Sequence, residues 1–450
     1  MRNLSPAWLL GGCVVSLLCL RLSVAAPTPD LAPDQVKTIV FTGATVLPVG
    51  APAIEGGLVV VQGGKIIALG PAGDVRVPEG AEVRDVTGKT IIPGLVCTHS
   101  HIGGAGGADG SGPIQPDVRV SDSLNVLDSG YMRALAGGIT TMNVMPGSGH
   151  LLSGQTSYLK MRDASTIEGL FIRTEGGKPM GGMKMANGTN SMKGGKFPGT
   201  RGRSAALMRK RFIAALEYSA KVEAAGDDID KLPNRHLGLE ALSQVLSGER
   251  VVHHHTHRHD DIVTVLRLAE EFNFRVVLHH VSEAWKVVDE IKAAGASCSI
   301  ILLDSPGGKL EAVDLSMKNG ALLEAAGVPV AYHTDDWITD SRLFLRMGAF
   351  GVRSGMTRDG ALAALTQSGA EMLDLGDRLG SLAPGKDADF VILSGDPFSV
   401  YTKVLETWVE GELRFDRSNP GHLLYAEGGY GAGHDQSPYF CCFDTFGGDQ

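Results

Sequence analysis

The sequence predicts an α/β fold with a parallel central sheet, together with a small β domain built from both ends of the chain. Between about residues 94 and 373, short apolar runs alternate with amphipathic helical stretches at the spacing of βα units. That interval matches the roughly 250 residues that an eight-fold barrel requires. Short strands separated by turns precede and follow the interval, and they indicate the second domain.

Composition describes an ordinary globular protein. The chain has 450 residues, of which 43% are hydrophobic and 20% charged, and its net charge is −9. This length can bury a large core, and the composition excludes an intrinsically disordered chain. The mild acidity gives no reason to expect nucleic acid as a partner.

The N-terminal residues 1–26 are expected to form a signal peptide. Arg2 supplies a positive charge, an apolar run covers residues 8–20, and small residues at 23–26 resemble a cleavage site. The run is too short for a good membrane span. We therefore expect an exported protein, periplasmic or secreted, without stable membrane insertion. An uncleaved anchor is the alternative.

The expected β domain combines residues 38–92 with residues 381–415. Turn residues separate its β-rich runs, which lie at 38–41, 57–61, 65–69, 388–393 and 404–410. Cys97 and Cys298 lie in apolar runs and are expected in the core, while the role of Cys441 and Cys442 stays open.

The expected barrel spans residues 93–375. Its clearest elements are helices at 261–271, 284–294 and 316–326 and strands at 275–280, 296–303 and 328–333. Residues 176–203 are rich in glycine and lysine, and they predict a long loop over the barrel mouth.

The first candidate site is His99 and His101, which follow the apolar run 91–97. Side chains two residues apart on a strand face the same way, so both imidazoles can bind one cation. In a parallel barrel, the carboxyl ends of the strands converge on the face where active sites form.

A second candidate is the histidine-rich segment 253–259. Alternation places His253, His255 and His257 on one face, whereas His254 and His259 are expected to be structural or surface residues. A solvated strand end would explain the segment without any metal.

Two further strands end in candidate ligands. His279 and His280 are neighbours, so only one of them should point into the barrel. His333 and Asp335 should share a face, whereas Asp336 points elsewhere or begins a loop. An ionised aspartate can bind a metal and accept a proton from water, although helix capping is the simpler role.

Lys184 lies in the apolar run 182–186. An isolated buried ammonium is costly unless it is paired or chemically altered. A surface lysine with a buried stem would explain the same pattern.

Taken in order, these motifs resemble the amidohydrolase superfamily, and within it the imidazolonepropionase-like and prolidase-like metal-dependent hydrolases. The resemblance covers about residues 38–415. It rests on the run 92–95 leading into His99 and His101, on the His255 and His280 strands, on Thr334-Asp335, and on the run 380–389.

The resemblance implies a TIM-like (β/α)8 barrel with a small composite β-sandwich. It also implies metal ligands at His99, His101, His255, His280 and Asp335, with Lys184 as the candidate for a carboxylated lysine that bridges two metals. The number of divalent ions, one or two, therefore stays open, and zinc is the expected metal. His257 is an alternative to His255 on the fifth strand.

The expected reaction is hydrolysis of a C–N bond in a small molecule: an amide, a cyclic amide or a dipeptide. Asp335 would act as general base, and His280, His257 or His333 would polarise the carbonyl. Deaminase-type chemistry on the same scaffold and a non-catalytic exported protein that sequesters metal are the alternatives. The tail, residues 416–450, is expected to pack on the barrel or on a second copy of the chain in a homo-oligomer.

Overall fold

The computed structural model describes residues 37–104, 109–302, 309–336 and 338–428. The expected signal peptide, residues 1–26, and the pair Cys441 and Cys442 lie outside these ranges. Both Cys97 and Cys298 are buried, as predicted. Among the described residues, no helix combines the length and apolar character that crossing a lipid bilayer requires.

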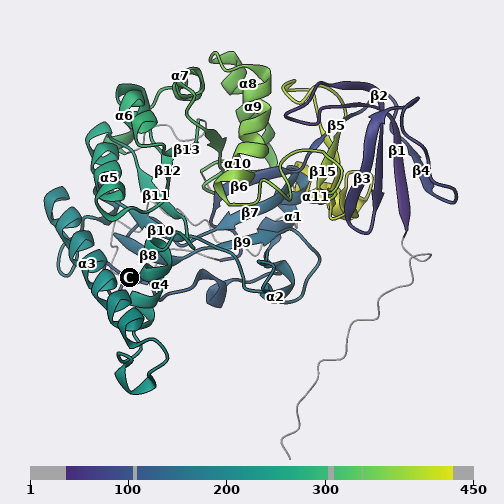
Figure 1. Ribbon diagram of the computed structural model, residues 1–450. Helices are drawn as coiled ribbons and strands as arrows, with labels where there is room; N and C mark the ends of the chain where they lie inside the picture. Colours follow the sequence, from purple (N-terminus) through teal and green to yellow (C-terminus); the bar gives the residue numbers. More distant parts are fainter. Residues whose placement is uncertain (1–36, 105–108, 303–308, 337, 429–450) are drawn as a thin grey trace, which may run out of the picture. The chain divides into compact units, whose positions relative to one another are not determined.

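Strands from both parts of the chain share one eight-stranded sheet. Its order is β17-β16-β15-β5-β1-β2-β3, with β4 parallel to β1. The strands are β1 (Thr38–Val46), β2 (Ile54–Gln62), β3 (Lys65–Pro71), β4 (Glu82–Asp85), β5 (Thr90–Pro93), β15 (Phe390–Leu393), β16 (Val404–Val409) and β17 (Glu412–Asp416). The antiparallel pair of β5 and β15 joins the N-terminal strands to the C-terminal ones (Figure 1). Aromatic rings from both groups, Phe41 and Phe390, meet edge to face with centroids 5.0 Å apart.

The central strands form two further sheets. The six-stranded sheet has the order β14-β13-β12-β11-β10-β8, and the three-stranded sheet has the order β6-β7-β9. Their bounds are β6 (Leu95–Ser100), β7 (Ile139–Val144), β8 (Leu152–Gln155), β9 (Ser157–Lys160), β10 (Met183–Ala186), β11 (Val252–Thr256), β12 (Val276–His280), β13 (Ser297–Ile300) and β14 (Val330–Tyr332). Strands β10 to β14 pair in parallel, as expected for successive βα units.

One stretch of the central strands departs from the parallel prediction. β9 is antiparallel to β7, and β8 is antiparallel to β10. Only Thr156 separates β8 from β9, so a single stretch joins the two sheets. On the other side, Asp335 N donates to His99 O at 3.0 Å and links the end of β14 to β6. The closed (β/α)8 barrel stays a prediction, and the predicted parallel pairing is found for β10 to β14 but not for β8 and β9.

Helices lie along the central strands (Figure 1). They are α1 (Ser129–Ala136), α2 (Ile167–Leu170), α3 (Arg201–Ala225), α4 (Leu237–Leu246), α5 (His259–Phe272), α6 (Val288–Ala293), α7 (Asn319–Ala326), α8 (Leu345–Arg353), α9 (Arg358–Leu365), α10 (Gln367–Met372) and α11 (Pro420–Glu427). Short 3₁₀ turns are η2 (Val120–Ser123), η3 (Thr189–Ser191), η4 (Ile229–Lys231), η5 (Ala284–Lys286), η6 (Leu310–Ala312) and η7 (Ser341–Leu343).

Helix α5 shows why the sequence predicts these elements well. Aspartates in its first turn stabilise the helix because their negative charges lie at the positive end of the helix dipole. Ile262, Val265 and Leu266 recur at helical spacing and are buried. Asn273 ends the helix in the left-handed conformation, with φ of 53°.

The expected loop at 176–203 is only partly a loop. Residues Met183–Ala186 form the buried strand β10, and Arg201 begins α3. Glycines on both sides of this four-residue strand hide its β pattern, because they give the segment the composition of a loop.

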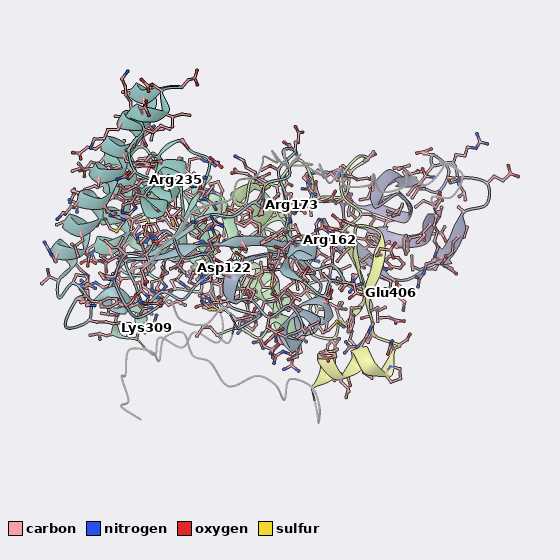
Figure 2. All side chains as sticks on the ribbon, turned by 90° about the horizontal axis from the view of Figure 1, so that it is seen from below. Asp122, Arg162, Arg173, Arg235, Lys309 and Glu406 are labelled. Atoms are coloured by element: carbon pink, nitrogen blue, oxygen red, sulfur yellow. The ribbon has the colours of Figure 1, made fainter. Side chains whose placement is uncertain are left out.

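A buried ionic network joins the central strands to the segment before β15. Lys160 Nζ on β9 lies 2.9 Å from Asp387 Oδ2 and 2.5 Å from Asp389 Oδ2, and all three residues are buried. Nearby, Arg162, labelled in Figure 2, donates to both carboxylate oxygens of Glu410. We call Lys160, Asp387 and Asp389 the junction network.

Candidate metal centre

His99, His101 and Asp335 meet at the carboxyl ends of β6 and β14. His99 Nε2 lies 3.2 Å from His101 Nε2 and 3.2 Å from Asp335 Oδ1. His101 Nε2 lies 3.0 Å from the same oxygen. These three side chains form a buried group whose ligand atoms are all close enough to hold one cation. The structure thus brings together His99, His101 and Asp335 as the sequence predicts.

The orientation of His101 follows from its other ring nitrogen. Nδ1 lies 2.7 Å from the carbonyl oxygen of Met145. Because a carbonyl oxygen can only accept, Nδ1 carries the proton and donates it. His101 Nε2 then faces Asp335 and His99, the arrangement in which it can serve as a metal ligand.

Lys184 lies on β10 beside this group. Its side chain is completely buried, and Nζ lies 3.2 Å from His99 Nε2. The surface-lysine alternative is therefore wrong. The parallel register places Lys184 opposite His253 of β11.

A second buried group consists of His255, His257 and His280. The rings of His255 and His280 are 4.4 Å apart, and His257 stacks on His280 at 5.0 Å. His257 Nδ1 lies 2.7 Å from Ser282 Oγ, which orients the ring. Both His255 and His257 thus belong to this group, so the structure does not force a choice between them.

A third group combines His99 with His279 and His333. His333 contacts Ser299 Oγ through Nδ1 at 2.7 Å and His280 Nδ1 through Nε2 at 3.2 Å. Because His99 belongs to two groups and His333 touches His280, the three groups form one continuous cluster. We call these seven histidines with Asp335 the histidine cluster: His99, His101, His255, His257, His279, His280 and His333.

The prediction that only one of His279 and His280 points inward is wrong. His279 joins the group of His99, and His280 joins the group of His255. The physical reason is the backbone: φ is 71° at His280 and 41° at Val281, so the chain leaves the strand conformation there. Strict alternation ends where the strand ends. Asp335, with φ of 49°, leaves β14 in the same way.

Asp336 supports the cluster from behind. Its Oδ2 accepts hydrogen bonds from Ser100 Oγ at 2.8 Å and from Thr334 Oγ1 at 2.9 Å, and its Oδ1 accepts from Ser341 Oγ. Burial raises the pKa of Asp336, and these hydrogen bonds partly offset that effect. The residue fixes the turn that carries Asp335 and does not join a metal-binding group of the described residues.

Electrostatics keep the imidazoles neutral. Burial is the largest cause that lowers the pKa of His99, His255, His257, His279 and His280 well below the usual value, and it lowers the pKa of His333 to about 3. For Asp335, burial acts to raise the pKa, but its neighbours His101, His333 and Lys184 outweigh that effect and keep the pKa below its usual value. Neutral imidazole and ionised carboxylate are the forms that bind metals.

The donor set fits a divalent cation. Within the described part of the chain, His99 Nδ1, His257 Nε2, His280 Nε2 and both ring nitrogens of His255 are buried without a hydrogen-bond partner. Buried polar atoms of this kind are rare in proteins and require a ligand or ordered water. Imidazole nitrogen with carboxylate oxygen is a ligand set that suits zinc and related transition metals.

Several supporting residues have no signal in the sequence. Ser282, Ser299 and Met145 orient histidines from other strands, and Tyr158 contacts His253 from β9. Their residue types and local patterns are ordinary, so only the fold reveals them. His254 and His259 are structural, as predicted: His254 is buried against its own backbone, and His259 forms a partly exposed pair with Glu283.

Comparisons with known proteins agree with this geometry. Residues 286–415 match the model of the amidohydrolase family. The solved structure of an amidohydrolase from Thermotoga maritima MSB8 has 33% sequence identity and a TM-score of 0.77, and the match covers 84% of this chain and all of that one.

Two curated relatives extend the comparison. Amidohydrolase tasK from Hapsidospora irregularis is 26% identical over 376 residues, which cover 77% of this chain but only 38% of the relative. An imidazolonepropionase from Xanthomonas campestris pv. campestris (strain 8004) is 23% identical over 360 residues, which cover 72% of this chain and 84% of the relative. Because the match to the Thermotoga structure exceeds 30% identity and covers that whole chain, this chain belongs to the amidohydrolase superfamily, a family of hydrolases that act on carbon–nitrogen bonds.

Proposed function

We propose that this chain is a metal-dependent hydrolase that cleaves a C–N bond in a small molecule: a non-peptide amide, a cyclic amide or a dipeptide. The observation that carries the proposal is the buried meeting of His99, His101 and Asp335, with Lys184 Nζ 3.2 Å from His99 Nε2. We also propose that the central strands complete a TIM-like barrel and that residues 1–26 direct export to the periplasm or the exterior.

The first group is the primary metal site. His99 and His101 supply imidazole nitrogens and Asp335 supplies a carboxylate oxygen. A divalent cation, zinc as the first choice, would activate water for attack on a carbonyl carbon when bound. Lys184, whose Nζ lies 3.2 Å from His99 Nε2, would supply a further ligand to this site through a carboxylated amine.

Asp335 is the proposed general base. The pKa of its carboxyl group is lowered and the group lies beside His99 and His101, so it can accept a proton from the attacking water and pass it to the leaving nitrogen. His280 Nδ1 lies 3.9 Å from Asp335 Oδ2, close enough for His280 to polarise the substrate carbonyl beside the base.

The number of ions depends on the second group. His255, His257 and His280 can hold a second cation with imidazole nitrogens alone. A binuclear centre therefore does not require Lys184 as a bridge. The name of the Xanthomonas relative, an imidazolonepropionase, supports a cyclic amide as the first substrate class to test.

Metal analysis of the purified protein, combined with a substrate screen, tests the proposal. We expect one or two tightly bound ions per chain and turnover of a cyclic amide, an N-acyl amino acid or a dipeptide. Release of ammonia from an exocyclic amine would identify the reaction as deamination and not as hydrolysis of an amide. Several weakly bound ions without turnover would instead indicate metal sequestration and contradict the proposal.

A further inference from the structure

A chain of hydrogen bonds connects Tyr158 to the histidine cluster. Tyr158 Oη lies 2.9 Å from His253 Nε2, and His253 Nδ1 lies 3.0 Å from His279 Nε2. All three side chains are buried. The remaining ring nitrogen of His279, Nδ1, has no hydrogen-bond partner among the described residues, and the residue belongs to the group with His99 and His333.

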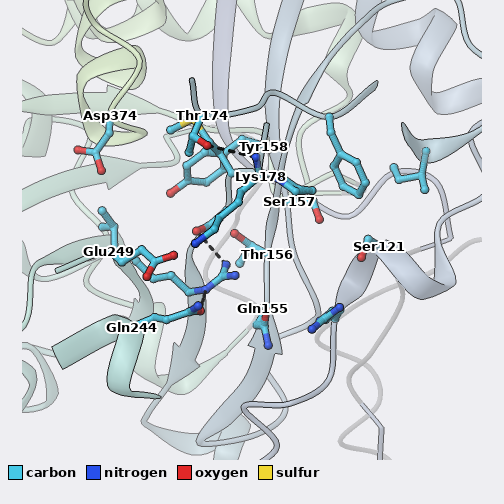
Figure 3. A pocket seen from close by; sticks show the side chains of 18 of the residues that line it. Ser121, Gln155, Thr156, Ser157, Tyr158, Thr174, Lys178, Gln244, Glu249 and Asp374 are labelled. Atoms are coloured by element: carbon cyan, nitrogen blue, oxygen red, sulfur yellow. Dashed lines mark hydrogen bonds between the residues drawn. The ribbon is translucent and has the colours of Figure 1, made fainter. Parts of the chain in front are cut away.

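Tyr158 stands at the boundary between the cluster and a separate cavity. It lines a pocket of about 440 Å³ whose other walls include Glu249 and Asp374 (Figure 3). Burial raises the pKa of Tyr158, so the side chain keeps its proton and acts as a neutral hydroxyl group. Water in the pocket can accept that proton in a hydrogen bond while the oxygen accepts from His253.

The fold holds His253 in place for this contact. A Cβ atom at position 182 would lie only 2.4 Å from His253 Cδ2, so the absence of a side chain at Gly182 leaves room for the ring. The parallel pairing of β11 with β12 sets His253 opposite Val277 and His255 opposite His279. The His253 ring therefore lies one step beneath the cluster, between Tyr158 and His279.

The direction of these hydrogen bonds decides which nitrogen of His279 carries its proton. If Tyr158 accepts from His253 Nε2, then His253 Nδ1 accepts from His279 Nε2, and His279 Nδ1 is left with a lone pair. If Tyr158 donates, every proton shifts to the other nitrogen and His279 Nδ1 becomes a donor. His101 shows the first pattern, because its outer nitrogen donates to Met145 and its inner nitrogen faces the cluster.

We propose that Tyr158 is a positioning residue that, through His253, holds His279, which groups with His99 and His333, in the tautomer that leaves a lone pair on Nδ1. This inference rests on the metal-dependent function proposed above. Removing the tyrosine oxygen leaves His253 Nε2 without an acceptor, so the His253 proton moves to Nδ1 and forces the His279 proton onto His279 Nδ1. The cluster then presents a donor where a metal needs a lone pair.

The variant Tyr158→Phe tests the relay in the full chain. We expect its affinity for Zn²⁺, measured by chelator competition, to fall about 10–100-fold. In the metal-free protein, ¹⁵N imidazole shifts should report a change of the His279 tautomer. Tyr332→Phe is the matched control, because Tyr332 is also a buried strand tyrosine but its hydroxyl contacts Met356 Sδ instead. It should match the wild type in both measurements.

A double-mutant cycle separates the relay from a merely structural role. In His253→Gln, the amide oxygen can accept from His279 without help from Tyr158, so adding Tyr158→Phe should cost little further affinity. If Tyr158→Phe fails to fold, the variants His253→Gln and His253→Leu are compared instead. Weaker Zn²⁺ binding is expected only for His253→Leu, because leucine cannot accept a hydrogen bond from His279.

Two results overturn the inference. One is wild-type Zn²⁺ affinity with an unchanged His279 tautomer in Tyr158→Phe. The other is a loss of affinity on Tyr158→Phe that is equally large in the His253→Gln background. If the wild type binds no ion tightly, the proposed function fails instead, and the tautomer of His279 in the metal-free protein still tests the relay.

Discussion

Two buried polar regions of this molecule, the junction network and the histidine cluster, are equally inaccessible to solvent but differ in how completely they are paired. In the junction network, Lys160 contacts two carboxylates, and Asp387 also accepts from Lys65 and Arg378. In the histidine cluster, several ring nitrogens have no partner among the described residues. Completed pairing is typical of a structural role, whereas unsatisfied buried atoms mark a place prepared for a ligand.

The comparison predicts different responses to mutation. Changes in the histidine cluster should affect metal binding and turnover more than folding, because several of its ring nitrogens form no hydrogen bond with the described residues. Changes in the junction network should affect folding and leave the metal site intact.

The largest effect is expected for Asp335→Asn. Loss of the proposed base should reduce kcat about 10²–10⁴-fold. The measurement is kcat together with the metal content of the same preparation, because Asp335 is also a proposed ligand. Full turnover with metal bound would remove Asp335 from the role of general base.

Lys160→Met should destabilise the fold. It leaves Asp387 and Asp389 buried without their shared cation, and breaking a buried ion pair in this way costs about 3–5 kcal/mol. Urea unfolding measures the loss, and the metal content of the folded protein should stay at the wild-type value. Unchanged stability together with loss of metal would contradict the structural role of the junction network.

Acid should affect the two regions in different pH ranges. Burial lowers the pKa of His333, a member of the histidine cluster, to about 3, so the unfolded chain binds this proton at a higher pH than the folded chain does. Stability of the metal-free protein should therefore fall as the pH drops below about 6.5, the ordinary value for histidine. For Asp387, burial acts to raise the pKa, but the charge of Lys160 and its other partners lower it to about 2.

The contribution of Asp387 is complete above about pH 4 and is lost as the pH falls towards 2, on the order of 2 kcal/mol. Thermal unfolding of the metal-free protein from pH 8 to pH 2 should show both ranges. Lys160→Met should retain the loss of stability below pH 6.5 and show a smaller loss below pH 4, because Lys65 and Arg378 still contact Asp387. A single loss confined to pH 4 and below would contradict the neutral histidine cluster.

The smallest effect is expected for Arg235→Ala. Arg235, labelled in Figure 2, pairs with Glu240 at 2.7 Å but is largely exposed, at 78%. Solvent and salt screen such a pair, so the midpoint of urea unfolding should not change measurably. This variant is the exposed counterpart of Lys160→Met, and a large loss of stability in it would weaken the argument from burial.

Local patterns predicted much of the fold and of the candidate site. The helical spacing at 261–271 and the apolar run at 275–280 correspond to α5 and β12. His99, His101 and Asp335 were placed at strand ends, and the structure brings them together. The sequence indicates Lys184 because an isolated buried amine is costly, and Lys184 lies beside His99.

Other features depended on the fold because no local signal exists for them. The antiparallel direction of β8 and β9 follows from how the chain returns between β7 and β10, which a short apolar run does not encode. Alternation failed at His279 and His280 because positive φ angles end the strand there.

The sequence by itself therefore determined the kinds of chemical group available and the strand ends on which they lie, since hydrophobic periodicity and residue type are local properties. Only the tertiary structure decided which groups meet. Tyr158, His253 and His279 come from three different strands, and whether a buried nitrogen is paired or left for a ligand depends on neighbours distant in the sequence.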